Sequence, residues 1–186
     1  MRIIGGNLRG KKIFLPKDKN TRPLRDLVKE SIFNLIQHSK KFNCSLENSN
    51  ILDLFSGVGS FGLECISRNS KKVIFFENYN EALSILKKNL KLLNIEDKYE
   101  IIKNNFFKFF HSKILIKEKF DIIFIDPPYK ETRTNSLINV LIEKKILKKN
   151  GIIIIHKHKK DDVTIDSKLK ILDQRNYGLS KIIIGN

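Results

Sequence analysis

The chain has 186 residues, 41% of them hydrophobic, which is enough for one globular domain with a sizeable core. Its net charge of +16 indicates a polyanionic partner such as nucleic acid, although heavy use of Lys, Asn and Ile throughout also fits biased genomic base composition. No apolar stretch is long enough to span a bilayer, and the first residues lack the apolar core of a secretory leader. The two cysteines, Cys44 and Cys65, form no disulfide framework, so we expect a cytoplasmic protein.

The first 20 residues interleave basic and apolar side chains around three glycines, which predicts a short basic hairpin that is not a core element. A helix is predicted from Pro23 to Gln37, because proline is tolerated in a first turn and apolar residues recur at helical spacing. Seven basic residues are candidates for binding nucleic-acid phosphates, with a solvated charged face as the alternative: Arg2, Arg9, Lys11, Lys12, Arg22, Arg25 and Lys29. We therefore divide the chain into an extension, residues 1–40, and a main domain, residues 41–186.

From Asn50 onward, predicted strands and helices alternate, which indicates a parallel sheet with helices on both faces. The strands are expected at residues 51–55, 72–76, 99–102, 120–125 and 151–155. The helices are expected at residues 61–68, 81–93, 106–116 and 135–147, the second with Asn80 as its N-cap. Two further strands, 168–173 and 179–184, have only turn residues between them and should pair antiparallel.

The first strand runs into a glycine-rich loop in which Gly57, Gly59 and Gly62 have GxGxxG spacing. Glycines here permit a tight turn and a close approach of the backbone to a ligand. Glu77 ends the next strand, where a carboxylate can accept hydrogen bonds from ribose hydroxyls. The pattern predicts a site for an adenosine-containing cofactor, and dinucleotides use the same fingerprint.

The segment Asp126-Pro127-Pro128-Tyr129 ends an apolar strand, at the sheet edge where open α/β folds bind their ligands. The Asp126 carboxylate and the Pro127 carbonyl can accept the two hydrogens of a planar amine. Tyr129 can stack on the ring that carries that amine. An NAD-dependent oxidoreductase would leave these four residues unexplained.

Three more residues bear on the cofactor. Asp53 stands at the mouth of the glycine loop, where a carboxylate can hold the cationic methionine amine of S-adenosylmethionine, and Ser56 belongs to the same loop. Asn105 follows the third strand, where its amide can reach an adenine, with a helix N-cap as the alternative. Asp53 and the segment Asp126 to Tyr129 are the two features that favour S-adenosylmethionine.

Residues 53–68 and 126–129 resemble the RsmD-type family of 16S ribosomal RNA guanine-N2 methyltransferases, and residues 2–13 and 21–34 resemble its N-terminal segments. The similarity spans nearly the whole chain. It implies a Rossmann-like, seven-stranded class I methyltransferase fold, S-adenosylmethionine as donor, and guanine 966 of small-subunit ribosomal RNA as acceptor. Carried over by motif, the cofactor positions are Asp53, Gly57, Gly59, Glu77 and Asn105, and the catalytic motif is Asp126 to Tyr129.

The chain departs from this family pattern at three places. Tyr79 and Asn105 stand where acidic residues are expected, and His156 ends the fifth strand, where an acidic residue is common. No metal is expected from His156-Lys157-His158 and the following Asp161-Asp162, because successive residues at a strand end point to opposite faces. We expect a monomer that acts on RNA within the ribosomal subunit. An adenine-N6 nucleic-acid methyltransferase and a non-catalytic RNA-binding assembly factor remain the alternatives.

Overall fold

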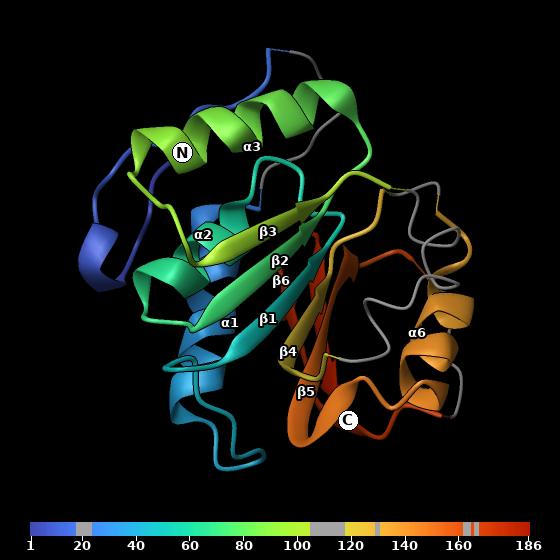
Figure 1. The fold of residues 1–186 in the computed structure, drawn as a ribbon. Helices are drawn as coiled ribbons and strands as arrows, with labels where there is room; N and C mark the ends of the chain where they lie inside the picture. Colours follow the sequence, from blue (N-terminus) through green and yellow to red (C-terminus); the bar gives the residue numbers. More distant parts are fainter. Residues whose placement is uncertain (18–23, 105–117, 129–130, 162–164, 166–167) are drawn as a thin grey trace.

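Seven strands form one mixed sheet in the computed structural model, which describes residues 1–17, 24–104, 118–128, 131–161, 165 and 168–186 (Figure 1). The helices are η1 (Gly6–Leu8), α1 (Asp26–His38), α2 (Ser60–Ser67), α3 (Asn80–Leu92) and α6 (Thr134–Glu143). The strands are β1 (Asn50–Leu54), β2 (Lys72–Phe76), β3 (Tyr99–Ile102), β4 (Phe120–Ile125), β5 (Leu147–His158), β6 (Ile171–Tyr177) and β7 (Ser180–Gly185). The predicted helix 106–116 and the predicted site residues Arg22, Asn105 and Tyr129 lie outside the described residues.

The strand order is β3-β2-β1-β4-β5-β7-β6. Strands β1 to β5 pair in parallel, and β7 runs antiparallel to both β5 and β6, so both pairing predictions are confirmed. Leu54, the last residue of β1, pairs with Phe76 of β2 and with Ile125 of β4. The carboxyl ends of these three strands therefore meet at the same level of the sheet.

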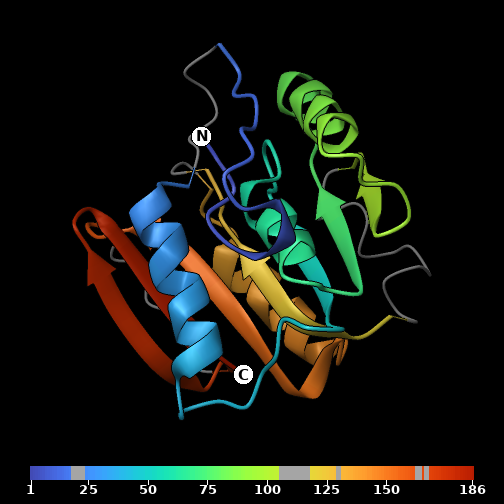
Figure 2. The same ribbon diagram turned by 90° about the vertical axis from the view of Figure 1, so that its left-hand side faces the viewer.

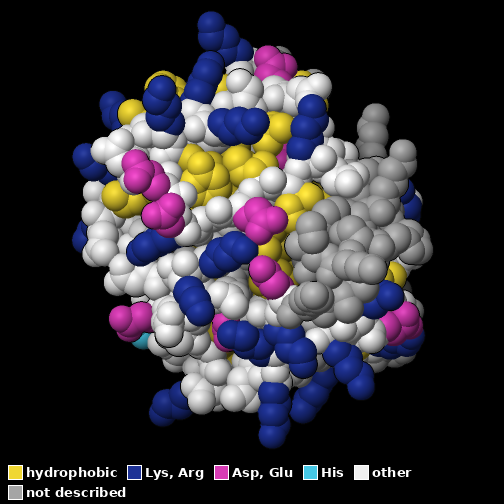
Figure 3. Space-filling model, viewed as in Figure 1, with side chains coloured by type: hydrophobic (Ala, Val, Ile, Leu, Met, Phe, Trp, Pro, Cys, Tyr) yellow, Lys and Arg dark blue, Asp and Glu magenta, His cyan; other side chains and the backbone are white. Residues whose placement is uncertain are grey.

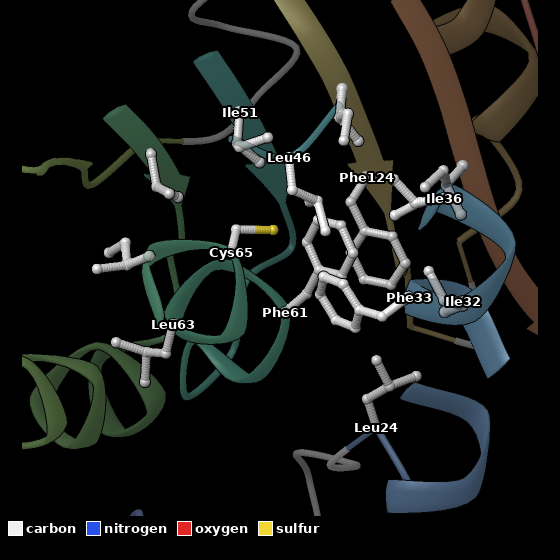
Figure 4. Close-up of a cluster of buried hydrophobic side chains, with 14 of the residues drawn as sticks. Leu24, Ile32, Phe33, Ile36, Leu46, Ile51, Phe61, Leu63, Cys65 and Phe124 are labelled. Carbon is white, nitrogen blue, oxygen red and sulfur yellow. The ribbon is translucent and has the colours of Figure 1, made fainter. Parts of the chain in front are cut away.

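Helices cover both faces of this sheet (Figure 2). Helices α1, α2 and α3 pack their apolar side chains into one core, which we call the α2-side core, and α6 packs into a second core on the other face. At the centre of the α2-side core, the ring of Phe61 stacks between those of Phe33 and Phe124, with centroid separations of 5.2 and 4.1 Å (Figure 4). Each such pair contributes about 0.5–1.5 kcal/mol beyond the area it buries. The stack ties α1 and α2 to β4.

The third glycine of the loop serves the packing of α2 against β2. A Cβ atom on Gly62 would lie 2.3 Å from the ring of Phe75, well inside van der Waals contact. Any larger residue would force the helix away from the strand. This spacing holds the start of α2 close to the carboxyl ends of β1 and β2.

Residues 1–17, which we call the arm, form the predicted basic hairpin but also contribute to the core. Arg2 bridges Lys12 in antiparallel fashion, and the Ile3 N–H donates to the Lys11 carbonyl at 2.9 Å. The expectation that the hairpin is not a core element is wrong, because Ile3 and Ile13 are buried in the α2-side core. Neighbouring residues of an extended chain point to opposite sides, so the basic side chains stay outside.

A buried carboxylate fastens the arm to α2. Glu64 is fully buried and accepts hydrogen bonds from the backbone N–H groups of Ile4, at 2.9 Å, and Gly5, at 2.7 Å. The Arg68 guanidinium donates to the same carboxylate at 3.1 Å, and the Lys29 ammonium lies 3.7 Å from it. The charge of Glu64 is thus paired and hydrogen-bonded, as a buried charge requires.

Lys29 is not an RNA contact, which corrects the sequence prediction. Its side chain is fully buried, and its ammonium donates to the Arg2 carbonyl at 2.7 Å. Burial lowers the pKa of Lys29, and the neighbouring Glu64 and Asp26 carboxylates oppose that shift. Arg25 precedes α1 in an extended conformation, so it does not share a helical face with Lys29.

Most of the other differences lie at element ends. Helix α1 begins at Asp26, and α3 begins at Asn80 with no side-chain cap, so the Asn80 N-cap prediction is wrong. Strand β5 begins four residues earlier than predicted, and the turn between β6 and β7 consists of Gly178 and Leu179. In the described parts of the chain, no helix has the length and hydropathy needed to span a membrane.

We predict that Glu64→Ala lowers the free energy of unfolding by about 3–5 kcal/mol, because it removes the only fully buried carboxylate beside Lys29 in the described chain and the acceptor of the Ile4 and Gly5 N–H groups. The matched control is Glu143→Ala, which removes an exposed ion pair with Lys168 and should change the stability by less than about 1 kcal/mol. Denaturant unfolding of both variants measures the difference. Similar small losses in the two variants would show that the arm does not depend on this carboxylate.

Candidate active site

Three carboxylates project from one face of the sheet at its carboxyl edge. Asp53 pairs in register with Phe75 of β2 and Phe124 of β4, whose rings lie in the α2-side core. Side chains alternate along a strand, so Glu77 and Asp126, each two residues further on, face the same side as those rings. The pairing of β1 with β2 and β4 therefore brings these acids together.

The glycine loop needs its first two glycines for different reasons. Gly57 and Gly59 adopt φ values of +55° and +85°, in the left-handed region that favours glycine. A Cβ on Gly59 would lie 2.5 Å from a methyl carbon of Leu86 in α3, whereas a Cβ on Gly57 would meet nothing within 4 Å. Gly59 thus permits close packing, and Gly57 presents its backbone to open space.

Glu77 is fixed by backbone donors. The Gly57 N–H donates to its Oε2 at 2.6 Å, and the N–H groups of Asn78 and Tyr79 donate to its Oε1 at 2.9 and 2.7 Å. The hydroxyl of Ser56 donates to the Phe76 carbonyl at 3.1 Å and holds the loop against β2. Glu77 is therefore preorganised beside the loop, as the sequence spacing predicted.

Asp53 is the most deeply buried of the three carboxylates. It is almost fully buried and accepts one hydrogen bond, from the Gly62 N–H at 3.0 Å. Burial raises its pKa well above the usual range, and the nearby carboxylates of Asp126 and Glu77 raise it further. Within the described chain, no cationic side chain forms an ion pair with Asp53. A ligand cation would compensate this concentration of negative charge.

The Asp-Pro-Pro segment presents two acceptors. Asp126 directly follows β4, and its side chain retains 24% exposure. The Pro128 carbonyl accepts from the Glu131 N–H at 2.8 Å. Among the described residues, the Pro127 carbonyl accepts no such bond, which leaves it available beside Asp126.

His156 is a site residue that the sequence analysis did not identify. Its Nδ1 lies 2.8 Å from Oδ1 of Asp126, and its Nε2 lies 2.9 Å from the Ser180 hydroxyl. The pairing of β4 with β5 explains why His156 lies beside Asp126. Ile125 and Ile155 are paired in β4 and β5, so the next residue of each strand, Asp126 and His156, stand side by side.

Comparison with known proteins agrees with this architecture. Residues 1–186 match the model of the family described as Conserved hypothetical protein 95. The chain is 37% identical over 163 residues to ribosomal RNA small subunit methyltransferase D of Buchnera aphidicola subsp. Acyrthosiphon pisum, covering 88% of this chain and 81% of that protein. It is 31% identical over 179 residues to the protein of the same name from Haemophilus influenzae, covering 96% and 90%. The chain belongs to the RsmD family.

The solved structure of the yhhF protein of Escherichia coli has the same fold as this RsmD family member. The TM-score is 0.83 at 24% identity, covering 100% of this chain and 96% of that one. The predicted seven-stranded class I methyltransferase fold is thereby confirmed.

The arm of this RsmD family member carries exposed basic residues and is joined to the glycine loop through one side chain of α3. Arg2, Arg9, Lys11 and Lys12 are exposed on the arm, and Arg25 is exposed before α1. The arm continues to Phe14, whose N–H donates to the Asn89 side chain at 2.7 Å, and that side chain donates to the Val58 carbonyl at 3.1 Å. Asn89, buried in α3 and unpredicted from sequence, thus joins the arm to the loop.

Positive charge is also abundant elsewhere. Figure 3 shows Lys and Arg side chains over much of one face, gathered along its lower edge, below β4 and β5 in Figure 1. The net charge alone therefore does not locate a nucleic-acid surface. The position of the arm beside the loop is the more specific observation.

We predict that Asp53→Asn stabilises the ligand-free protein, and that the gain grows as pH rises. A carboxyl group whose pKa is raised in the folded state stabilises the fold at a pH below its unfolded pKa. This contribution is lost as pH rises through the folded pKa, and the free energy of unfolding then falls by up to about 1.4 kcal/mol per pH unit. The asparagine variant does not titrate. Unfolding free energies of both proteins from about pH 5 to about pH 9 measure the difference.

The matched control, Asp173→Asn, should change the stability in the opposite direction. Asp173 is also buried, but hydrogen bonds from Lys41 at 2.8 Å and Arg175 at 3.3 Å outweigh burial and lower its pKa. Asp173→Asn should therefore lose about 1–3 kcal/mol at neutral pH, and this loss should shrink as pH falls through the folded pKa of Asp173. If both variants shifted stability in the same direction at neutral pH, the unpaired state of Asp53 would be contradicted.

Proposed function

We propose that this protein transfers a methyl group from S-adenosylmethionine to the exocyclic N2 amine of a guanine in small-subunit ribosomal RNA, the guanine at position 966. The observation that carries the proposal is Asp126 beside the Pro127 carbonyl, on the same face as Asp53 and Glu77. The relatives named ribosomal RNA small subunit methyltransferase D support the reaction and the class of RNA.

The carboxylates fit S-adenosylmethionine. Bound in this site, that molecule would supply a methyl group on a positively charged sulfur. Asp53, which has no cationic side chain beside it in the described chain, would pair with the methionine ammonium. Glu77, held at the loop by three backbone N–H groups, would accept hydrogen bonds from the ribose hydroxyls. Ser56, Gly57 and Gly59 would line the loop, and we assign Asn105 to the adenine.

The acceptor amine needs help because its lone pair is delocalised into the guanine ring. We assign its two hydrogens to Asp126 and to the Pro127 carbonyl, which favours a pyramidal nitrogen with its lone pair aimed at the methyl group. The lone pair forms the new N–C bond, and the electrons of the broken S–C bond stay on sulfur. The nitrogen then carries a positive charge and releases one proton to Asp126. Tyr129 would stack on the flipped-out base, and Pro128 belongs to the same catalytic motif.

The arm is the RNA-binding surface in this proposal. Arg2, Arg9, Lys11 and Lys12 are exposed and would contact phosphates, with Arg22 and Arg25 extending the surface within residues 1–40. Residues 41–186 would hold the donor and the catalytic motif. We propose that the protein acts in the cytoplasm as a monomer, on RNA within the ribosomal subunit.

We predict that Asp126→Ala lowers kcat by about 10³-fold while the Kd for S-adenosylmethionine changes by less than about tenfold. The reason is that Asp126 contacts the acceptor amine and not the donor. Label transferred from S-adenosylmethionine to small ribosomal subunits lacking native methylation measures kcat, and calorimetry measures the Kd. Glu118→Ala, an exposed carboxylate just before β4, is the matched control and should keep wild-type values. Unchanged turnover in Asp126→Ala would refute the assignment.

We predict that replacing Lys11 and Lys12 with alanine weakens binding to small-subunit RNA and flattens its dependence on salt. Each lost phosphate contact should reduce the slope of log K against log salt concentration by about 0.7–0.9. The control double variant, Lys144→Ala with Lys149→Ala, removes the same charge from two exposed positions, one just after α6 and one near the start of β5. Equal slopes for the two double variants would place the RNA contact outside the hairpin.

A further inference from the structure

A hydrogen-bonded chain of three side chains crosses strands β7, β5 and β4. The Ser180 hydroxyl lies 2.9 Å from Nε2 of His156, and Nδ1 of the same ring lies 2.8 Å from Oδ1 of Asp126. Ser180 is 3% exposed and His156 is 9% exposed, whereas the Asp126 side chain is 24% exposed. The chain therefore runs from the buried interior outward to the carboxylate at the sheet edge.

The strand pairing explains why these residues meet. In the antiparallel pair of β5 and β7, Ile182 lies opposite His156, and Ser180 is two residues away from Ile182. Residues two apart on a strand face the same side, so Ser180 and His156 face the same side of the sheet. Ile125 of β4 pairs with Ile155 of β5, and Asp126 and His156 are the next residues along the chain. This pairing brings the ring and the carboxylate together.

The distances define where the protons lie. A ring nitrogen and a carboxylate oxygen 2.8 Å apart must share a proton, because two lone pairs facing each other would repel. A hydroxyl can donate to a ring nitrogen, whereas an ionised carboxylate can only accept. When Ser180 donates to Nε2, the ring proton is on Nδ1 and points at Oδ1 of Asp126.

Ser180 is not a nucleophile in this arrangement. Although serine, histidine and aspartate in series also occur in hydrolases, there the serine oxygen is open to substrate. Here Ser180 is buried, and the exposed end of the chain of hydrogen bonds is the carboxylate. The geometry is suited to orienting Asp126.

We propose that His156, whose ring is held between Ser180 and Asp126, is the positioning residue for Asp126 in methyl transfer. This inference rests on the proposed function. The ring engages Oδ1, and within the described chain no hydrogen bond is made to Oδ2, which is left for the acceptor amine. Fixing one oxygen stops the carboxylate from turning away and holds the other in the geometry the reaction needs.

The test compares two replacements of His156. His156→Leu removes the donor and should lower kcat by about 10–100-fold, the loss typical of residues that orient a catalytic group, with KM for both substrates within about threefold of wild type. His156→Asn can place an amide N–H near the position of Nδ1 and should recover at least about tenfold of that loss. Ser180→Ala, which keeps the histidine, should lose less than His156→Leu.

Three results would overturn the inference: wild-type kcat in His156→Leu, equal losses in His156→Leu and His156→Asn, or a change confined to KM. Thermal unfolding of each variant shows whether a loss reflects misfolding. Ser180→Ala, with its smaller change, decides the question if His156→Leu does not fold.

A measurement that needs no turnover accompanies the kinetics. In wild-type protein labelled with ¹⁵N-histidine, His156 should carry its proton on Nδ1, and this preference should be lost in Asp126→Ala. A ring protonated only on Nε2 in the wild type would contradict the proposal. If the wild type itself transfers no methyl group to ribosomal RNA, the proposed function and the catalytic role of His156 both fail. If it does transfer and His156→Leu is unaffected, the inference fails alone.

Discussion

The parallel pairing of β1 with both β2 and β4 is the constraint on which the site depends. It pairs Leu54 with Phe76 and Ile125, so that the carboxyl ends of the three strands lie at the same level of the sheet. Three carboxylates then emerge on one face without any direct bond between them. Their arrangement is fixed by backbone hydrogen bonds and by the apolar cores on either side of the sheet, and so it persists without a ligand.

The site concentrates negative charge at a cost in stability. Asp53 is buried with a single backbone hydrogen bond, and its neighbours Asp126 and Glu77 are also acidic. In a site designed only for stability, such a carboxylate would be paired, as Glu64 is with Lys29 and Arg68. The contrast between these two buried acids separates Glu64, which fastens the fold, from Asp53, which we propose pairs with a ligand cation. Natural proteins commonly carry such unfavourable groups where they bind ligands.

Sequence patterns predicted the central strands β2 and β4 well because these strands are almost entirely buried. Apolar runs such as residues 120–125 can be accommodated only in the interior of the sheet, and the bounds of β2, β3 and β4 agree with the prediction. Element ends were predicted less well: Asn80, predicted as an N-cap, is the first residue of α3, and β5 begins four residues before its predicted start. The glycine loop was predictable because Gly57, Gly59 and Gly62 are each required by backbone geometry or packing.

Contacts between distant segments could not be predicted from local pattern. Lys29 has the spacing of a surface residue, yet the arm folds over it and its ammonium meets Glu64, 35 positions away. Asn89 has no sequence signal, and its role follows from the arm lying against α3. His156 was taken as a departure from the family pattern. Only the register of β4 with β5 shows that it stands beside Asp126.

The most direct test of the account is to identify the nucleoside that receives the label. Small ribosomal subunits lacking native methylation are incubated with the protein and labelled S-adenosylmethionine, and the RNA is digested to nucleosides. The account predicts label in N2-methylguanosine, because Asp126 and the Pro127 carbonyl are assigned to the guanine amine. Label in methyladenosine would contradict the assignment of the base while leaving the donor site intact. No label, with S-adenosylmethionine bound, would contradict the assignment of Asp126 as the acceptor-amine residue for this RNA.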